Sequence, residues 1–188
     1  MDPYHIVLFV HILTLLVAAG ATAVTKLAAG RRARARTVGE ALDWHNILLA
    51  GAKLFPLCLL AFVVTGGYMM SVTRIPSSTG FIVAGLVGSL LLLTSGVYLA
   101  TKGNALKQVL EGIAKNGADQ PAPRLLPPPL VAVLPVINTG IALSVAFDMV
   151  TKPTSIPVAL SVIAVGILLA AATTLRRPAP VVEEASAA

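Results

Sequence analysis

Four polar side chains stand inside long apolar runs, and their types could bind a metal or haem or transfer a proton. His11, Lys53, Ser89 and Asn138 each interrupt a different apolar stretch. Counted at about 1.5 Å per helical residue, they fall at a similar depth in a membrane. Ionisable residues at such depths normally face the interior of the helix bundle or water. We therefore expect these four side chains to form an intramembrane polar cluster.

Lys53 has two structural interpretations that the sequence leaves open. Its long apolar stem could carry the ammonium group back to the inner headgroup level, where Glu40 or Asp43 would receive it. Alternatively, the ammonium group bonds to Asn138 or His11 inside the bundle. A neutral amine held there could bind a metal or haem iron, or transfer a proton.

A second candidate site lies where several predicted helices reach the outer surface. Thioether and imidazole ligands suit copper(I). Methionine is also an ordinary packing residue in membrane proteins, so packing is the simpler interpretation. The candidate ligands are His5, Met69, Met70 and Met149, with Asp2 and Asp148 at the same level.

The remaining histidine and the single cysteine suggest structural roles. Cys58 lies in an apolar run and has no second cysteine to pair with, so we expect a small buried packing residue. His45 follows Trp44 at the expected inner interface, where the tryptophan would anchor the helix and the histidine would be a surface residue. Most of the membrane thickness separates His45 from His11. His5 and His11 are six residues apart and face different directions. A haem held by two histidines of one chain is therefore hard to build, whereas His11 as a single ligand remains possible.

The composition is that of an integral membrane protein. Of 188 residues, 56% are hydrophobic and 12% charged, and the mean hydropathy is +0.87; soluble proteins carry roughly 25% charged residues. The chain has no phosphate-binding loop, no H-E-x-x-H zinc motif and no G-x-S-x-G elbow, so none of these enzyme signatures is present.

Five apolar stretches approach or exceed the roughly 20 residues needed to cross a bilayer as a helix. The sequence therefore predicts an all-α bundle of five transmembrane helices, forming one unit over residues 1–177 and followed by a disordered tail at 178–188. The predicted spans are residues 3–27, 44–70, 80–101, 129–150 and 154–175.

Two connecting features can also be predicted. Leu106, Leu110 and Ile113 recur at helical spacing, which indicates a short helix that either lies on the inner surface or extends the third span. The proline-rich residues 120–129 predict an extended connector.

Small residues mark the expected helix contacts. In the third span the pairs are Ala84 with Gly88 and Gly85 with Ser89. The inward face of the first span is formed by His11, Thr14, Ala18, Thr22 and Thr25.

The distribution of positive charge predicts the orientation. Eleven of the fourteen lysines and arginines lie on one side of the five spans and two on the other, with Lys53 inside a span. Cytoplasmic loops carry the excess of positive charge, so we expect the amino terminus outside and the carboxyl terminus inside a bacterial inner membrane. The net charge of +6 is then explained by anionic lipid rather than nucleic acid. The first basic cluster is Arg31, Arg32, Arg34 and Arg36.

Two segments resemble a loosely related group of small bacterial membrane proteins. The segments are "HIVLFVHILTLLVAAGA" and "KLFPLCLLAFVVTGGYMM". The resemblance covers the first two predicted spans, about a third of the chain. The group includes uncharacterised integral membrane families, the copper-resistance D type membrane domain and the haem-biosynthesis protein HemJ. The resemblance implies a helix bundle with the family histidine at His11. In HemJ-like proteins an intramembrane histidine and lysine serve a haem-linked function, which implies comparable roles for His11 and Lys53.

We therefore expect a small non-enzymatic integral membrane protein, either an accessory subunit or a helper that handles haem or a metal. One alternative is a haem-linked porphyrinogen oxidoreductase that uses His11 and Lys53. The other is a copper-transport component with the outer methionine and histidine site. The expected cofactor is haem b or copper, and the expected partners are the lipid bilayer and other membrane subunits or a second copy of the chain.

Overall fold

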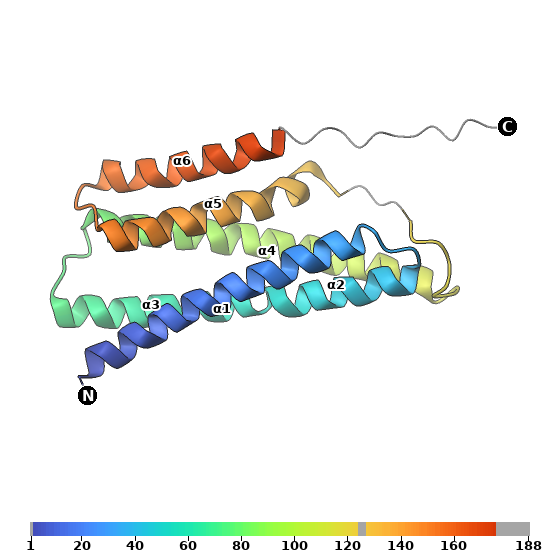
Figure 1. Ribbon diagram of the computed structural model, residues 1–188, viewed down its shortest axis with the longest axis horizontal. Helices are drawn as coiled ribbons and strands as arrows, with labels where there is room; N and C mark the ends of the chain where they lie inside the picture. Colours follow the sequence, from blue (N-terminus) through green and yellow to red (C-terminus); the bar gives the residue numbers. More distant parts are fainter. Residues whose placement is uncertain (1, 124–126, 176–188) are drawn as a thin grey trace.

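The fold is a bundle of helices joined by short loops (Figure 1). The computed structural model describes residues 2–123 and 127–175, and within these the only β pairing is a single bridge between Thr37 and Pro121. The helices are α1 (Pro3–Arg32), α2 (Val38–Ala52), α3 (Leu54–Thr73), α4 (Gly80–Ala114), α5 (Pro129–Thr151) and α6 (Ile156–Leu175).

The bundle contains five segments that are long and apolar enough to cross a membrane, because α2 and α3 together form one segment. The predicted all-α, five-span architecture is thus confirmed, and the chain is a multi-pass membrane protein. The predicted tail at 178–188 lies outside the described residues.

The second span is interrupted at Lys53, which stands in a turn between α2 and α3. Pro56 explains the interruption. It has no backbone N–H to donate to the carbonyl of Ala52, and its ring would clash with that carbonyl in a regular helix. The helix therefore bends here, and Lys53 lies at the bend.

Several helices are longer than predicted at one end of the bundle. We call this the basic end; it contains the α1–α2 loop (residues 33–37) and the end of α4 at Ala114. At the opposite, N-terminal end, α1 begins and the α3–α4 and α5–α6 loops turn. The amphipathic segment after residue 101 extends the third span as helix α4, so the second of the two predicted arrangements is confirmed.

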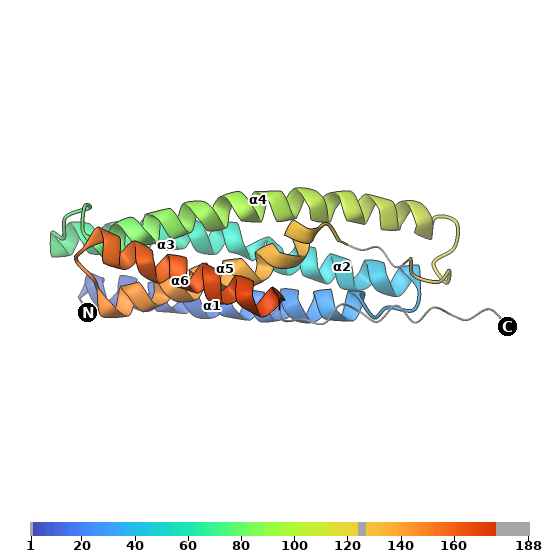
Figure 2. The ribbon, with the colours of Figure 1, turned by 90° about the horizontal axis from the view of Figure 1, so that it is seen from above.

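The helices form two groups (Figures 1 and 2). Helix α1 packs against α2 and α3, and α4 packs against α5 and α6. The groups meet mainly where α2 contacts α4, whereas α3 touches α4 only sparsely. Within the described residues α1 has no contact with α4, α5 or α6, and α5 has none with α2 or α3.

Small residues let α4, α5 and α6 approach closely. A Cβ atom added to Gly140 would lie 2.5 Å from the carbonyl oxygen of Gly166, and one added to Gly88 would collide with Val145. Such close approach is how helices associate in lipid, where hydrophobic burial gives no advantage. The predicted contact face of the third span is confirmed at Ala84, Gly85 and Gly88, which are buried; the core of this group is Ala84, Ile141, Ala159 and Ile163.

A separate small core lies at the basic end, where α1, α2 and α4 extend beyond α5 and α6 (Figure 1). Val38, Ala41 and Leu110 form it. The backbone N–H groups of Val38 and Gly39 donate to the carbonyls of Gln120 and Ala118, at 3.0 and 2.9 Å. The segment after α4 thus satisfies two N–H groups that the first turn of α2 would leave unpaired.

Candidate functional site

His11 and Thr65 form the principal polar contact inside the α1–α3 pair. The Nδ1 atom of His11 lies 2.7 Å from Oγ1 of Thr65. Thr65 is buried on α3, and His11 is half-buried on α1. The predicted inward face of the first span is consistent with this contact, since Thr14 is buried and Ala18, Thr22 and Thr25 are partly buried.

The hydrogen bonds of Thr65 determine the tautomer of His11. The Thr65 hydroxyl lies 2.6 Å from the carbonyl oxygen of Ala61, which can only accept a hydrogen bond. The hydroxyl must therefore donate its single hydrogen to Ala61, and its oxygen accepts from His11. It follows that Nδ1 of His11 carries a hydrogen, and in the neutral ring Nε2 then carries a free lone pair.

The surroundings of the ring leave this Nε2 available. Among the described residues, the ring has no hydrogen bond other than the one at Nδ1. Phe62 meets it edge-on, with ring centroids 5.0 Å apart, and Gly66 leaves space beside Cε1. An imidazole oriented through Nδ1 with a bare Nε2 is the usual arrangement of a metal ligand.

An apolar groove of about 230 Å³ runs between α1 and α3 beside this contact. Val10 and Thr14 line it from α1, and Ala61, which accepts the Thr65 hydrogen bond, lines it from α3; His11 itself is not among the lining residues. Cys58 also lines the groove and is 7% exposed, so its predicted role as a buried packing residue is confirmed.

Lys53 does not join His11 or Asn138. Thr65 follows Lys53 by twelve residues, which places His11 about 18 Å away along the axis of α3. Asn138 is on α5, which does not contact α2 or α3. The side chain of Lys53 is exposed on the surface of the bundle. The interior position predicted for this lysine is therefore wrong, because depth along the helix was estimated but direction around it was not.

Asn138 pairs with a different serine from the one we predicted. Its Oδ1 lies 2.8 Å from Oγ of Ser95, which follows Ser89 by six residues along α4. Ser89 is half-buried and has no side-chain hydrogen bond among the described residues. The predicted four-residue cluster is thus replaced by two separate pairs, His11 with Thr65 and Asn138 with Ser95.

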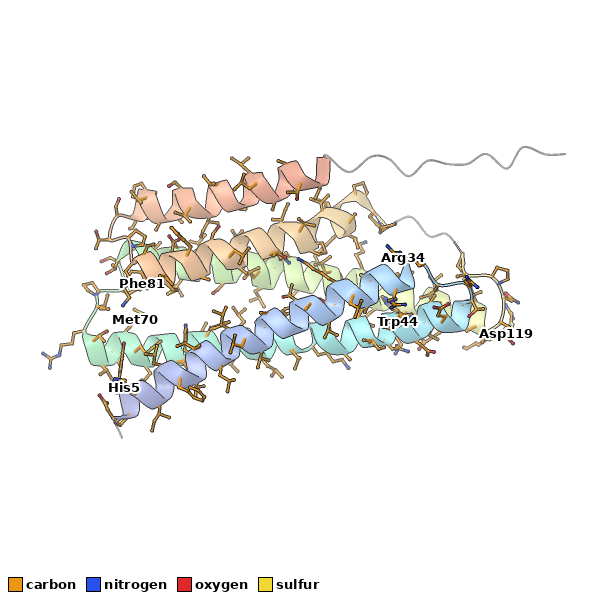
Figure 3. All side chains as sticks on the ribbon, viewed as in Figure 1. His5, Arg34, Trp44, Met70, Phe81 and Asp119 are labelled. Carbon is orange, nitrogen blue, oxygen red and sulfur yellow. The ribbon has the colours of Figure 1, made fainter. Side chains whose placement is uncertain are left out.

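The predicted outer methionine and histidine site is not assembled. Met149 packs its Cε atom against Gly85 in the α4–α5 contact. Met69 and Met70 are on α3, which does not contact α5. His5 is exposed and pairs with Asp2 at 3.6 Å, while Met70 projects on the side of α3 nearer Phe81 (Figure 3). Met149 is therefore a packing residue of the α4–α5 contact.

His45 is fully buried at the basic end, so the prediction of a surface residue is wrong. Its Nδ1 lies 2.8 Å from Nη1 of Arg32, and its Nε2 lies 2.8 Å from the carbonyl of Gly103. Arginine can only donate and a carbonyl can only accept, so His45 is neutral with its hydrogen on Nε2. Both ring nitrogens are occupied, and this histidine joins α1, α2 and α4.

The other arginines of the first basic cluster differ in their contacts. The Arg31 guanidinium lies 5.8 Å from the centroid of the Trp44 ring, a distance at which a cation is attracted to the face of an aromatic ring. Arg34 and Arg36 are exposed at the basic end. Figure 3 shows Arg34 and Trp44 near the end of α1, at the basic end.

Comparison with known proteins identified no relative of this chain. No protein-family model, curated protein or solved structure matches the chain.

The arrangement around His11 can therefore supply one imidazole nitrogen ligand within an apolar surface. The sequence pointed to His11 but not to Thr65, since a threonine in an apolar helix usually bonds only to its own backbone. The pair of half-buried Arg32 and buried His45 also gave no sequence signal, because arginines at the end of a span are expected to face water or lipid.

Proposed function

We propose that this protein is a non-enzymatic helper or accessory subunit that binds haem b through Nε2 of His11. The observation that carries the proposal is the chain of hydrogen bonds from His11 to Thr65 and from Thr65 to Ala61. It orients the imidazole and leaves one unprotonated nitrogen in an apolar environment.

The scarcity of further ligands favours haem over a free metal ion. The described residues contain no group of three or more His, Cys, Asp or Glu side chains able to hold a metal. A free ion bound at His11 would have one ligand from this chain. A haem brings four nitrogen ligands of its own and needs one axial ligand from a protein.

The position of Lys53 argues against the oxidoreductase alternative. That function requires His11 and Lys53 to act on one molecule, yet about 18 Å of helix lies between Lys53 and the contact of His11. Haem binding without catalysis requires only His11.

We further propose that the protein lies in a bacterial cytoplasmic membrane with its amino terminus outside. The basic end carries Arg31 from the last turn of α1, Arg34 and Arg36 from the α1–α2 loop, and Lys107 and Lys115 from α4 and its end. Positive charge marks the cytoplasmic side, so this end would face the cytoplasm and its anionic lipid.

The test is a spectroscopic titration of the purified, detergent-solubilised protein with ferric haem. We expect a Soret band that saturates at one haem per chain. In His11→Ala the affinity should fall at least tenfold and the spectrum should lose the features of histidine ligation. His5→Ala is the matched control, since His5 is exposed near the start of the same helix. Unchanged haem affinity and spectrum in a folded His11→Ala protein would reject the proposal.

A further inference from the structure

Asp148 is a carboxyl group enclosed within the α4–α5–α6 group. Its exposed fraction is 0%, and neither carboxyl oxygen has a hydrogen-bond partner among the described residues. It belongs to the inward face of α5, together with Ile141 and Ser144. An ionisable side chain so placed in a membrane protein is normally functional.

The contacts of neighbouring residues place Asp148 at a definite level. Ser144, one turn before it, donates from Oγ to the carbonyl of Val162 on α6, at 3.1 Å. Met149 packs against Gly85 on α4. Because α5 runs antiparallel to both helices, Asp148 lies near Ala84 and Ala159, which are themselves fully buried. The walls facing the carboxyl group are therefore small and apolar.

Among the described residues, no cationic side chain forms an ion pair with Asp148. Residues 80–101 of α4 and all of α6 contain no charged side chain, and Tyr98, the one titratable group there, lies toward the basic end. The loops at this end of the bundle contain two cationic residues, Lys152 and Arg74, and both are exposed.

The first backbone donors of α4 are also committed elsewhere. The first helical residues of α4, Gly80 and Phe81, donate their N–H groups to the carbonyls of Thr154 and Pro153, each at 2.9 Å. The N-terminus of α4 therefore contributes only its partial positive charge. An ionised carboxylate would remain buried without a partner, which is strongly unfavourable.

We propose that Asp148 is a proton-binding site, and that its carboxyl group holds a proton in the closed bundle. The protonated acid is neutral, and its O–H can donate to a backbone carbonyl, each of which has a second lone pair. Since the group is enclosed, the proton leaves only when α5 separates from α4 or α6 near the N-terminal end. Proton release is thereby linked to opening of this helix group, independently of haem binding at His11.

Infrared spectroscopy of the purified, full-length protein tests the proposal. At neutral pH we expect the carbonyl stretching band of a protonated carboxylic acid, which Asp148→Asn should remove. Asp119→Asn is the matched control, since Asp119 is exposed in the segment after α4; this variant should keep the band. If Asp148→Asn does not fold, Asp148→Glu, which retains an acid, should shift the band instead.

Three results would overturn the proposal. One is a wild-type spectrum without an acid band in buffer free of added metal ions. The second is an acid band that persists unchanged in folded Asp148→Asn. The third is an acid band that appears only after sodium or calcium is removed, since a metal cation would then be the ligand of Asp148.

Discussion

Arg32 donates from Nη1 to Nδ1 of His45 across 2.8 Å, and so ties the end of α1 to α2. His45 in turn donates from Nε2 to the carbonyl of Gly103 on α4. One imidazole thus connects the three helices that extend beyond α5 and α6. Because α2 is the main contact between the two helix groups, this histidine holds the groups in register.

The first prediction is that His45→Phe destabilises the folded protein. Phenylalanine retains an aromatic ring but removes both hydrogen bonds, and it leaves the Arg32 guanidinium without its acceptor. We expect a loss of roughly 1–3 kcal/mol in the free energy of unfolding. Thermal unfolding in detergent measures this loss. Asn46→Ala, at the exposed neighbouring residue, is the control and should leave the melting temperature unchanged.

The second prediction is that Lys53→Met has little effect. Leu49 of α2 faces Gly103 of α4. Lys53 follows Leu49 by one helical turn, and α4 runs in the opposite direction. Lys53 is therefore level with a point on α4 about one turn before the exposed Lys102. The lysine stem can span that distance and place its charge at the headgroup level. Methionine replaces the apolar stem, and we expect a change below about 1 kcal/mol. A large destabilisation, measured by the same unfolding assay, would instead indicate an interior partner for Lys53.

Hydropathy and helix periodicity predicted much of the fold, because lipid requires long apolar helices with internally satisfied backbones. The five spans and the buried small residues Ala84, Gly85 and Gly88 follow from these requirements. The ends at Arg32 and Ala114 were harder to predict. Beyond the apolar runs the chain remains a good helix former, so the helices continue past the apolar stretch.

The polar contacts were predicted only in part. Sequence spacing gives the depth of His11, Asn138 and Lys53, but the direction of each side chain depends on how the helices pack. His11 could be selected as a ligand from its depth and its position among small residues. Its partner Thr65 could not, since many threonines in these helices bond only to the preceding turn, as Thr94 does.

The third prediction concerns the close contact between α5 and α6. Gly140→Ala would place a Cβ atom 2.5 Å from the Gly166 carbonyl oxygen, so the two backbones must move apart. We expect a loss of roughly 1–3 kcal/mol in stability. Gly96→Ala is the matched control on α4, where nothing lies within 4 Å of the added atom; it should be neutral or slightly stabilising. Equal stabilities for the two variants would contradict the close packing.

The fourth prediction concerns orientation in the membrane. A reporter enzyme inserted between residues 74 and 79 should be active on the outside, and one inserted between residues 116 and 120 should be cytoplasmic. The reason is the gathering of positive charge at the basic end. Two insertion sites on the same side would contradict the five-span bundle, and an inverted result would reject the proposed orientation alone.

The fifth prediction returns to the partner of His11. Thr65→Val keeps the size and shape of the side chain but removes the oxygen that accepts from Nδ1 of His11. Without that acceptor the imidazole loses its orientation and its preference for the tautomer with a free Nε2. Substitution of such a supporting residue typically weakens ligation by about 10- to 100-fold. We therefore expect haem affinity to fall by this amount in the spectroscopic titration, while His11 remains present. Thr94→Val, at an exposed threonine of α4 that bonds only to its own helix, should bind haem as the wild type does. If Thr65→Val and Thr94→Val bind haem equally well, the hydrogen bond from His11 to Thr65 does not prepare the ligand.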